Sequence, residues 1–253
     1  MGKTVQSTIN FIPTDLPVRT MYGTADFYGY ANNKQSVTIY DARGREDEFT
    51  LSKNGFQYIT HTNNDMSTKS ITPQPAYIKV ASHTIRSSLA DLNSEYTGTP
   101  GPARAAHLDH TPLGANNYLH EKVPHEEASW LAKTRWAIIN VWRPLKTIKR
   151  DPLAVCDGST LQPGDLLPIQ MDYSRNVRAK ALGGEKGLKT TVGWEIAMAK
   201  YNIEQRWYYL SDMGVEDVLL MKIFDSELVG GLDEGRVAVH SSFEHPDAKD
   251  GEV

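Results

Sequence analysis

Three residues with metal-binding side chains stand out in this sequence. His107 and Asp109 are separated by one residue in the run HLDHT, and His240 lies far downstream in the run RVAVHSSF. In an extended segment, residues i and i+2 point to the same face, so an imidazole and a carboxylate can converge on one ion. Two histidines and one carboxylate on one face of the ion leave three positions open. This ligand set is typical of non-heme Fe(II) oxygenases, which need open positions for O2, substrate and any cosubstrate.

His240 fits the third ligand position best because it lies on the last predicted strand. The other histidines that compete for this position fit it less well, and they are His61, His83, His120, His125 and His245. His110 directly follows Asp109, so we expect it beside the site rather than on the metal. The HxD spacing alone is weak, since histidines and aspartates of surface loops that hydrogen-bond locally have it too.

Short β-rich segments dominate the elements that must position these residues. Alternating or apolar runs predict strands at residues 36–40, 49–51, 56–60, 76–85, 136–145, 153–155, 166–169, 194–198, 206–210, 218–224 and 236–243. Many strands with one or two helices indicate a mainly β barrel or sandwich rather than alternating βαβ units.

Loop and helix signals fill most of the remaining chain. Residues 93–115 are rich in Gly, Pro, Ser and Thr and are expected to be largely loop, with 107–111 as a short extended piece. Pro124 begins the clearest helix, which carries acidic residues in its first turn. Pro13 and Pro17 predict an irregular N-terminal arm, which we take as residues 1–35.

Composition indicates one ordinary globular domain spanning residues 1–253. The net charge of −4 gives no electrostatic reason to expect nucleic acid or an anionic membrane as a partner. Cys156 is the only cysteine, so no intrachain disulfide can form. The first residues lack the apolar core of a signal peptide, and no run is long enough to span a bilayer. These features favour a cytoplasmic protein, and no pattern specifies an oligomeric state.

Other chemistry-bearing patterns are weaker. The run GGEKGLKT at residues 183–190 departs from the spacing of a phosphate-binding loop and is expected to be a solvated loop. Cys156 lies in an apolar stretch and is expected in the core rather than as a nucleophile. Trp207, Tyr208 and Tyr209 could line a substrate pocket or pack in the core, since aromatic residues are common in strands.

Several longer runs resemble one enzyme family. They lie within residues 36–245, in the family's order, and are VTIYDARGREDEFTLSKNGFQYITH, HLDHTPLGA, RWAIINVWRPL, DPLAVCDGSTLQPGDLLP, QRWYYLSDMGVEDVLLMKIFDS and VAVHSSFEHP. Together they make the chain similar to the fungal and bacterial non-heme iron enzymes that include gibberellin desaturase, the AsaB hydroxylase/desaturase and the CmcJ cephalosporin methoxylation component.

The resemblance implies a double-stranded β-helix, a jelly-roll or cupin-like barrel, with an Fe(II)- and 2-oxoglutarate-dependent dioxygenase activity. It implies hydroxylation or desaturation of a small organic substrate with O2 in secondary metabolism. It also assigns His107, Asp109 and His240 as the catalytic metal ligands. His110 departs from the family pattern, which usually has Gln there.

The resemblance also raises the question of what binds 2-oxoglutarate. Family members continue past the HSSFEHP-like run into a final strand with arginines, and this chain has no arginine after His240. A dicarboxylate needs a cationic partner. We expect Arg143 or Arg236 to take this role, and Arg86 is a third candidate. Arg236 shares a face with His240 if their strand is regular.

Two other functions stay open at this point. The barrel could keep its metal without using 2-oxoglutarate, as a redox-neutral isomerase or lyase, or as an oxygenase that takes its electrons from substrate. It could also be a binding barrel without catalysis, which the intact ligand set disfavours.

Overall fold

The computed structural model describes residues 3–13, 19–21, 33–62, 75–88, 101–172, 194–227 and 236–249. Its strands are β1 Thr4–Phe11, β2 Arg19–Met21, β3 Asn33–Asp41, β4 Phe56–Thr60, β5 His107–Leu108, β6 Ala137–Trp142, β7 Leu153–Cys156, β8 Leu166–Asp172, β9 Glu195–Ala199, β10 Trp207–Tyr209, β11 Asp217–Asp225 and β12 His240–Ser242. Its helices are α2 Pro112–Lys122 and α3 His125–Leu131, with the 3-10 turns η1 Glu46–Glu48 and η2 Gly158–Thr160. The prediction of a mainly β fold is confirmed.

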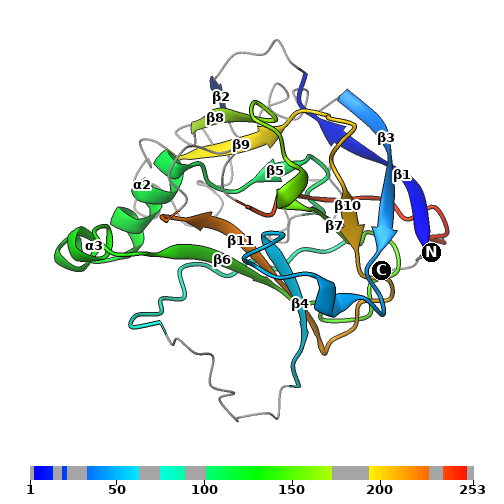
Figure 1. Ribbon diagram of the computed structural model, residues 1–253, viewed down its shortest axis with the longest axis horizontal. Coiled ribbons are helices and arrows are strands. Elements are labelled where there is room, and N and C mark those ends of the chain that lie inside the picture. Colours follow the sequence, from blue (N-terminus) through cyan, green and yellow to red (C-terminus); the bar gives the residue numbers. More distant parts are fainter. Residues whose placement is uncertain are drawn as a thin grey trace.

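The strands form two sheets. The larger sheet has the order β1-β3-β10-β7-β12-β5-β9-β8-β2, and the smaller has the order β4-β11-β6. The larger sheet curls around the smaller one, and the two helices lie at one side of the molecule (Figure 1). Most neighbours are antiparallel, while β10 runs parallel to β3 and β2 runs parallel to β8. The two sheets therefore enclose an open barrel.

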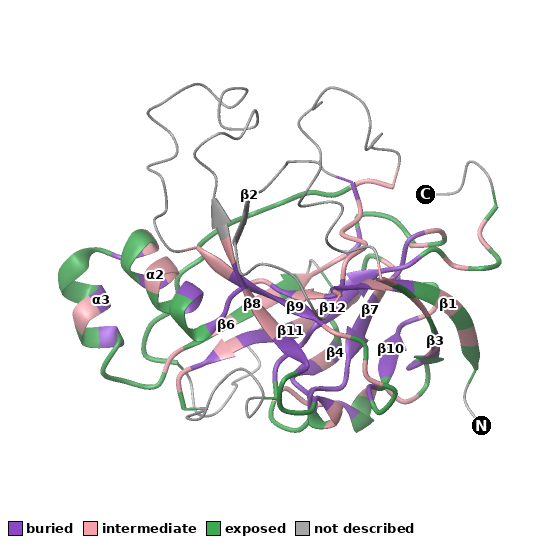
Figure 2. Ribbon diagram, turned by 90° about the horizontal axis from the view of Figure 1, so that it is seen from above, coloured by how far each residue is buried: buried purple, intermediate pink, exposed green. Residues whose placement is uncertain are grey.

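The main core fills the space between the two sheets. The aromatic rings of Phe49 and Phe56 stack at 4.9 Å, and Tyr208 of β10 lies 4.7 Å from Phe49 between ring centroids. Trp207 is buried beside Phe11 of β1 at 5.9 Å. Buried residues gather along the central strands, as Figure 2 shows in purple. Trp207, Tyr208 and Tyr209 all belong to this core, so the packing interpretation of the aromatic run is confirmed.

The helices form a separate small cluster. Leu119, Val123, Ala128 and Leu131 pack together, with Trp136 against them. The helix at Pro124 is confirmed as α3, but α2 was not predicted, and its first turn lies in residues 93–115, which were expected to be loop. Thr111 caps α2 by accepting a hydrogen bond from the Gly114 backbone N–H at 3.1 Å. The Gly and Asn residues of α2 have low helix propensity, which hid the helix.

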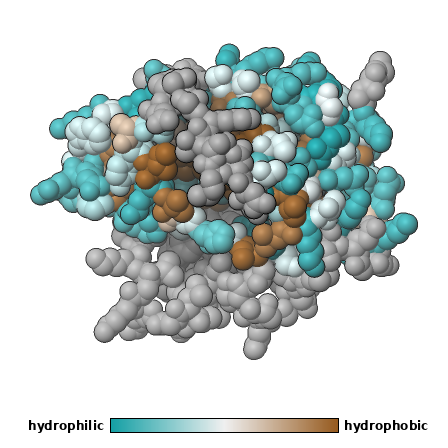
Figure 3. All heavy atoms as spheres, turned by 90° about the horizontal axis from the view of Figure 1, so that it is seen from below, coloured by the Kyte–Doolittle hydropathy of each residue, from teal (hydrophilic) through white to brown (hydrophobic). Residues whose placement is uncertain are grey.

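The prediction of a half-buried strand at residues 76–85 is wrong. This stretch is extended but exposed, and it forms no strand in the structure. Its alternation of apolar and polar residues leaves Ile78 and Val80 at 78% and 84% exposure. Figure 1 places this segment below β6, and the face seen from below carries patches of hydrophobic residues (Figure 3). Period-2 alternation therefore marked an extended chain without showing that a sheet would cover it.

Three further expectations need correction. Residues 49–51 lead into a turn, because Phe49 enters the core and the chain then reverses. The N-terminal arm is not irregular throughout, since β1 pairs with β3 from Thr4 to Phe11 and buries Ile9 and Phe11. The strand expected at residues 236–243 is reduced to β12, although residues 237–239 are buried. Hydrogen bonds from Ala238 to Lys222 and from Cys156 to Val239 tie this stretch to β11 and β7 outside a regular ladder.

Strand β2 also lies in the arm that was expected to be irregular, and the other strands agree with the predicted segments to within a few residues at each end. Residues 183–190, the glycine- and lysine-rich run, lie outside the described residues. Across the described parts of the chain, every helix is too short or too polar to cross a membrane.

Candidate metal centre

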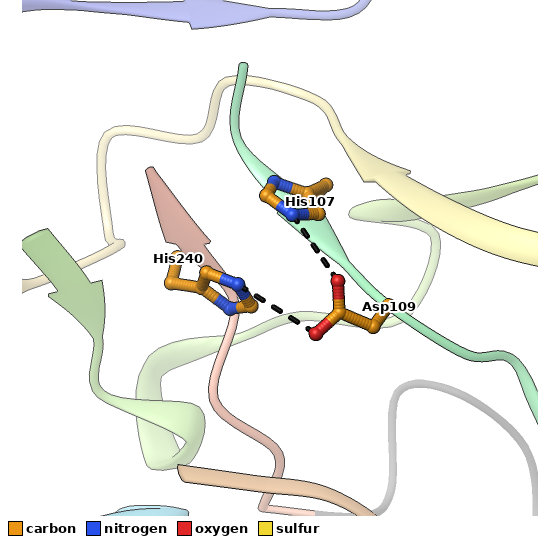
Figure 4. A group of neighbouring side chains, drawn as sticks. All are labelled: His107, Asp109 and His240. Atoms are coloured by element: carbon orange, nitrogen blue, oxygen red, sulfur yellow. Dashed lines mark ion pairs between the residues drawn. The ribbon is translucent and has the colours of Figure 1, made fainter. Parts of the chain in front are cut away.

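Two neighbouring strands of the larger sheet carry the predicted metal ligands. His107 of β5 and His240 of β12 are direct partners across an antiparallel pair. Residues directly opposite each other in such a pair project their side chains to the same face. Asp109 follows β5 immediately and turns its carboxylate toward both rings (Figure 4). The structure therefore brings together three residues that the sequence separates by more than half of its length.

The distances fit a single small ion. Nε2 of His107 lies 3.3 Å from Oδ1 of Asp109, and Nε2 of His240 lies 3.8 Å from Oδ2 of Asp109. All three ligand atoms lie within 4.8 Å of one another. Ligands bound about 2.1 Å from one ion at right angles lie about 3 Å apart. Only a small inward movement of the side chains is needed to coordinate a metal.

Backbone carbonyls orient both imidazoles. Nδ1 of His107 lies 2.7 Å from the carbonyl oxygen of Ala105, and Nδ1 of His240 lies 3.0 Å from that of Ala238. A carbonyl oxygen only accepts hydrogen bonds, so Nδ1 carries the proton in each neutral ring. In a neutral ring the lone pair of Nε2 therefore faces Asp109, whereas a protonated ring donates its Nε2–H to that carboxylate. This arrangement is the usual outer support of a metal-binding histidine.

The smaller sheet orients the carboxylate. The side-chain amide of Asn140 in β6 donates a hydrogen bond of 2.6 Å to Oδ2 of Asp109. The indole N–H of Trp194 donates to the backbone oxygen of Asp109 at 3.4 Å. No expectation from the sequence placed Asn140 at the site. A polar residue inside the apolar run AIINVW was the available signal.

The charges of the site are strongly coupled. Burial raises the pKa of Asp109, but the hydrogen bond from His107 and the two nearby imidazoles hold that pKa well below its usual range. Burial opposes a proton on His107, yet Asp109 raises the pKa of this ring above its ordinary value. Burial and the charge of His107 lower the pKa of His240 to about 4. Near neutral pH His240 is therefore neutral, and at most one of the two imidazoles, that of His107, carries a second proton.

His110 lies beside the centre without joining the ligand set. Its ring is buried, 4.6 Å from the ring of Tyr118 and stacked 5.8 Å from that of Trp194. Burial lowers the pKa of His110 and keeps the ring neutral. Because Trp194 donates to the backbone oxygen of Asp109, this aromatic stack supports the segment that carries the candidate carboxylate ligand.

The two arginines expected to bind a cosubstrate, Arg143 and Arg236, donate hydrogen bonds to backbone carbonyls in the structure. Arg143 donates to the backbone oxygens of Val215 at 2.7 Å and His61 at 2.9 Å. Arg236 is exposed and donates to the backbone oxygen of Ser52 at 3.4 Å. The stretch before His240 is not a regular strand, so the shared face expected for Arg236 and His240 does not arise. No contact between either guanidinium and the triad is present among the described residues.

A curled, mainly β fold that brings two histidines and an aspartate within 4.8 Å of one another is typical of the class of mononuclear non-heme iron oxygenases. A family model described as "Oxidoreductase/YMDC permease-like domain" matches residues 73–253. The hydroxylase/desaturase efuI of Hormonema carpetanum is 33% identical over 88% of this chain and 81% of its own length. The hydroxylase/desaturase asaB of Aspergillus flavus is 32% identical over 98% of this chain and 89% of its own length.

A solved structure gives the same assignment. The iron and alpha-ketoglutarate-dependent endoperoxidase NvfI superposes with a TM-score of 0.74 and 25% sequence identity, covering 99% of this chain and 93% of that one. The chain belongs to the hydroxylase/desaturase family of Fe(II)/2-oxoglutarate-dependent oxygenases. The double-stranded β-helix implied by the resemblance is confirmed by this match.

Proposed function

We propose that this protein is an Fe(II)/2-oxoglutarate-dependent dioxygenase that hydroxylates or desaturates a small organic molecule of secondary metabolism. His107, Asp109 and His240 are proposed to hold the iron. Dependence on 2-oxoglutarate is supported by relatives such as the dioxygenase nvfI of Aspergillus novofumigatus, which is 30% identical over 83% of this chain. We further propose that residues 1–253 form one domain that acts in the cytoplasm.

The observation that carries the proposal is that the three candidate ligand side chains already converge and that both rings are held in orientation. Two Nε2 atoms and one carboxylate converge within 4.8 Å, while both Nδ1 atoms are held by backbone carbonyls. Neutral imidazoles and a carboxylate suit a divalent transition metal, and three protein ligands leave positions open for other molecules. Bound Fe(II) would supply the activation of O2, which protein side chains cannot provide.

Neighbouring groups of the chain position the three proposed ligand side chains. Asn140 fixes the carboxylate, and the carbonyls of Ala105 and Ala238 fix the two rings. Trp142 lies two residues after Asn140 on the same face of β6, where Leu219 and Met221 of β11 lie directly opposite. Leu219 and Met221 are buried in the main core, so their apolar side chains limit the access of water from that side of Asn140.

The test of the proposed site is metal stoichiometry. Protein reconstituted without oxygen should bind one Fe(II) per chain, and His107→Ala and His240→Ala should lose this binding. His120→Ala is the matched control, because this histidine lies on α2 outside the triad. Full-affinity binding by His240→Ala would remove that residue from the ligand set.

The test of the proposed reaction is cosubstrate use. On mixing the iron-loaded protein with 2-oxoglutarate and O2, succinate should form at a rate that depends on iron. Turnover that proceeds without 2-oxoglutarate would instead support the metal-dependent enzyme that uses no such cosubstrate.

A further inference from the structure

His110 follows Asp109 directly and is a buried histidine that the proposed ligand set does not use. The residue is 6% exposed, and its Nδ1 is buried without a hydrogen-bond partner. A buried polar atom without a partner costs free energy, so a histidine that served the protein through its nitrogens would have them paired. The structure therefore indicates that His110 acts through the packing of its ring.

Two aromatic residues from different elements pack against this ring. Tyr118 of α2 lies 4.6 Å from His110 between ring centroids, and Trp194, just before β9, lies 5.8 Å away with its plane inclined by 19°. The rings of Tyr118 and Trp194 lie 6.4 Å apart. All three separations are in the range in which aromatic rings attract one another. His110, Tyr118 and Trp194 therefore form a three-ring cluster in which each ring contacts the other two.

The indole of Trp194 connects this cluster to the backbone of the candidate carboxylate ligand. Its N–H donates a hydrogen bond of 3.4 Å to the backbone oxygen of Asp109. That oxygen belongs to the peptide unit that joins Asp109 to His110. One indole therefore contacts both this peptide unit and the side chain that follows it. Because a peptide unit is planar and rigid, these two contacts together restrict how the backbone can turn at Asp109.

The bond from the indole depends closely on where the ring lies. A distance of 3.4 Å exceeds the usual range for an N–H donor and an oxygen acceptor, so a small displacement of the indole would break it. The backbone on both sides is fixed separately, since the Thr111 N–H donates to the backbone oxygen of Glu195 at 3.0 Å. The contacts with His110 and Tyr118 act on the indole ring itself. Loss of the His110 ring would therefore move the donor while the backbone frame stays in place.

We propose that His110 is a positioning residue of the metal centre, whose ring holds the Trp194 indole where its N–H reaches the backbone oxygen of Asp109. The proposal rests on the proposed function, because it takes Asp109 as a ligand of the iron. It requires a ring at this position and gives no role to the ring nitrogens. Gln, the residue that the similar enzymes usually carry here, has no ring and would hold the indole less firmly.

The test is titration of metal-free protein with Co(II), followed by calorimetry and by the visible absorption of the bound ion. His110→Ala and His110→Gln should raise the dissociation constant by about 3- to 10-fold, the range of one neutral hydrogen bond, and should shift the absorption. His110→Phe keeps a ring, so its affinity should stay within about twofold of that of the intact protein, with the same absorption. Its midpoint of thermal unfolding should not fall, because the unpaired buried nitrogen is removed.

A double-variant series tests whether His110 acts through the indole N–H. Trp194→Phe removes this N–H and keeps an aromatic ring. Adding His110→Ala to Trp194→Phe should therefore change the Co(II) affinity and absorption no further, since both changes break the same contact. His245→Ala is the matched control, because this histidine also packs its ring against aromatic residues, Tyr209 and Phe243, beyond the end of β12. The control should leave the Co(II) absorption unchanged.

Three results would overturn the positioning role and leave the proposed function standing. They are a His110→Phe protein that loses affinity as His110→Ala does, a His110→Ala protein that keeps the intact affinity and absorption, and a full further loss in the Trp194→Phe background. If His110→Ala does not fold, His110→Gln takes its place in the comparison. Expected Co(II) results with no succinate formed from 2-oxoglutarate would instead overturn the proposed function alone. An intact protein that binds no metal would overturn both.

Discussion

Replacement of Asn140 with Ala should weaken metal binding without unfolding the protein. The change removes the 2.6 Å hydrogen bond to Oδ2 of Asp109, the proposed ligand that carries a negative charge. A hydrogen bond to a charged group is worth about 1.5–3 kcal/mol, which corresponds to a factor of about 10 to 150 in affinity. The Asp109 side chain is 32% exposed, so water replaces part of the lost bond. We therefore expect the dissociation constant for Fe(II) or Co(II) to rise by about 10- to 50-fold.

Calorimetric titration of metal-free protein with Co(II) measures this change directly. Asn202→Ala is the matched control, since Asn202 donates an equivalent bond of 3.0 Å to Asp165 away from the centre. The control should lower the midpoint of thermal unfolding while keeping the metal affinity of the intact protein. Visible absorption of bound Co(II) should also shift in Asn140→Ala, because the carboxylate is free to turn. Metal affinity within twofold of the intact protein would refute the positioning role of Asn140.

Four other outcomes follow from the structure. Near neutral pH His240 is already neutral, because its pKa is lowered to about 4, so metal binding should release at most one proton from the histidine pair, and His107 would supply it. Because Asp109 raises the pKa of His107, metal affinity should fall as pH falls through that raised pKa. Calorimetry in buffers of different ionisation enthalpy counts the protons, and release of two would contradict this scheme. Metal at 100 times its dissociation constant should add about 2.7 kcal/mol to the free energy of unfolding, and His240→Ala should lose this gain in thermal melts. Cys156 is buried and its thiol pKa is raised by burial, so a thiol reagent should label it only after denaturation, and rapid labelling of the native protein would argue against that burial. Gly158→Ala should cost about 1–3 kcal/mol because its new Cβ would lie 2.7 Å from the Val237 carbonyl oxygen, whereas Gly214→Ala meets nothing closer than 3.9 Å and should be tolerated in denaturant titrations.

Local patterns predicted those parts of the fold that local chemistry determines. Strands such as β4 and β11 show apolar or β-branched runs, so their positions were evident before their partners were known. The segment at residues 76–85 has the same kind of pattern and is exposed, because alternation does not specify whether a neighbour covers one face. Helix α2 was missed because its capping by Thr111 outweighs the weak propensities of its Gly and Asn residues.

Some residues of the candidate site were likewise predictable from local sequence patterns, and others were not. The pairing of His107 with Asp109 depends on a two-residue spacing and was accessible from the sequence. The contact of Asn140 with Asp109 depends on how the smaller sheet approaches the larger one, which no local pattern specifies. The anchoring of Arg143 and Arg236 to loop carbonyls likewise depends on tertiary contacts. Side chains were therefore predictable where one strand presents them and unpredictable where two sheets must meet.

The central position of β12 has a consequence for how the protein is made. This strand of three residues joins β7 to β5 in the middle of the larger sheet, although it is the last strand described along the chain. A ribosome therefore releases β7 and β5 long before the strand that fills the gap between them. Until then both strands expose unpaired edges, which are prone to association with other chains. Closure of the sheet and assembly of the metal ligands are the same late event, so newly synthesised protein should gain its metal affinity and its resistance to aggregation together.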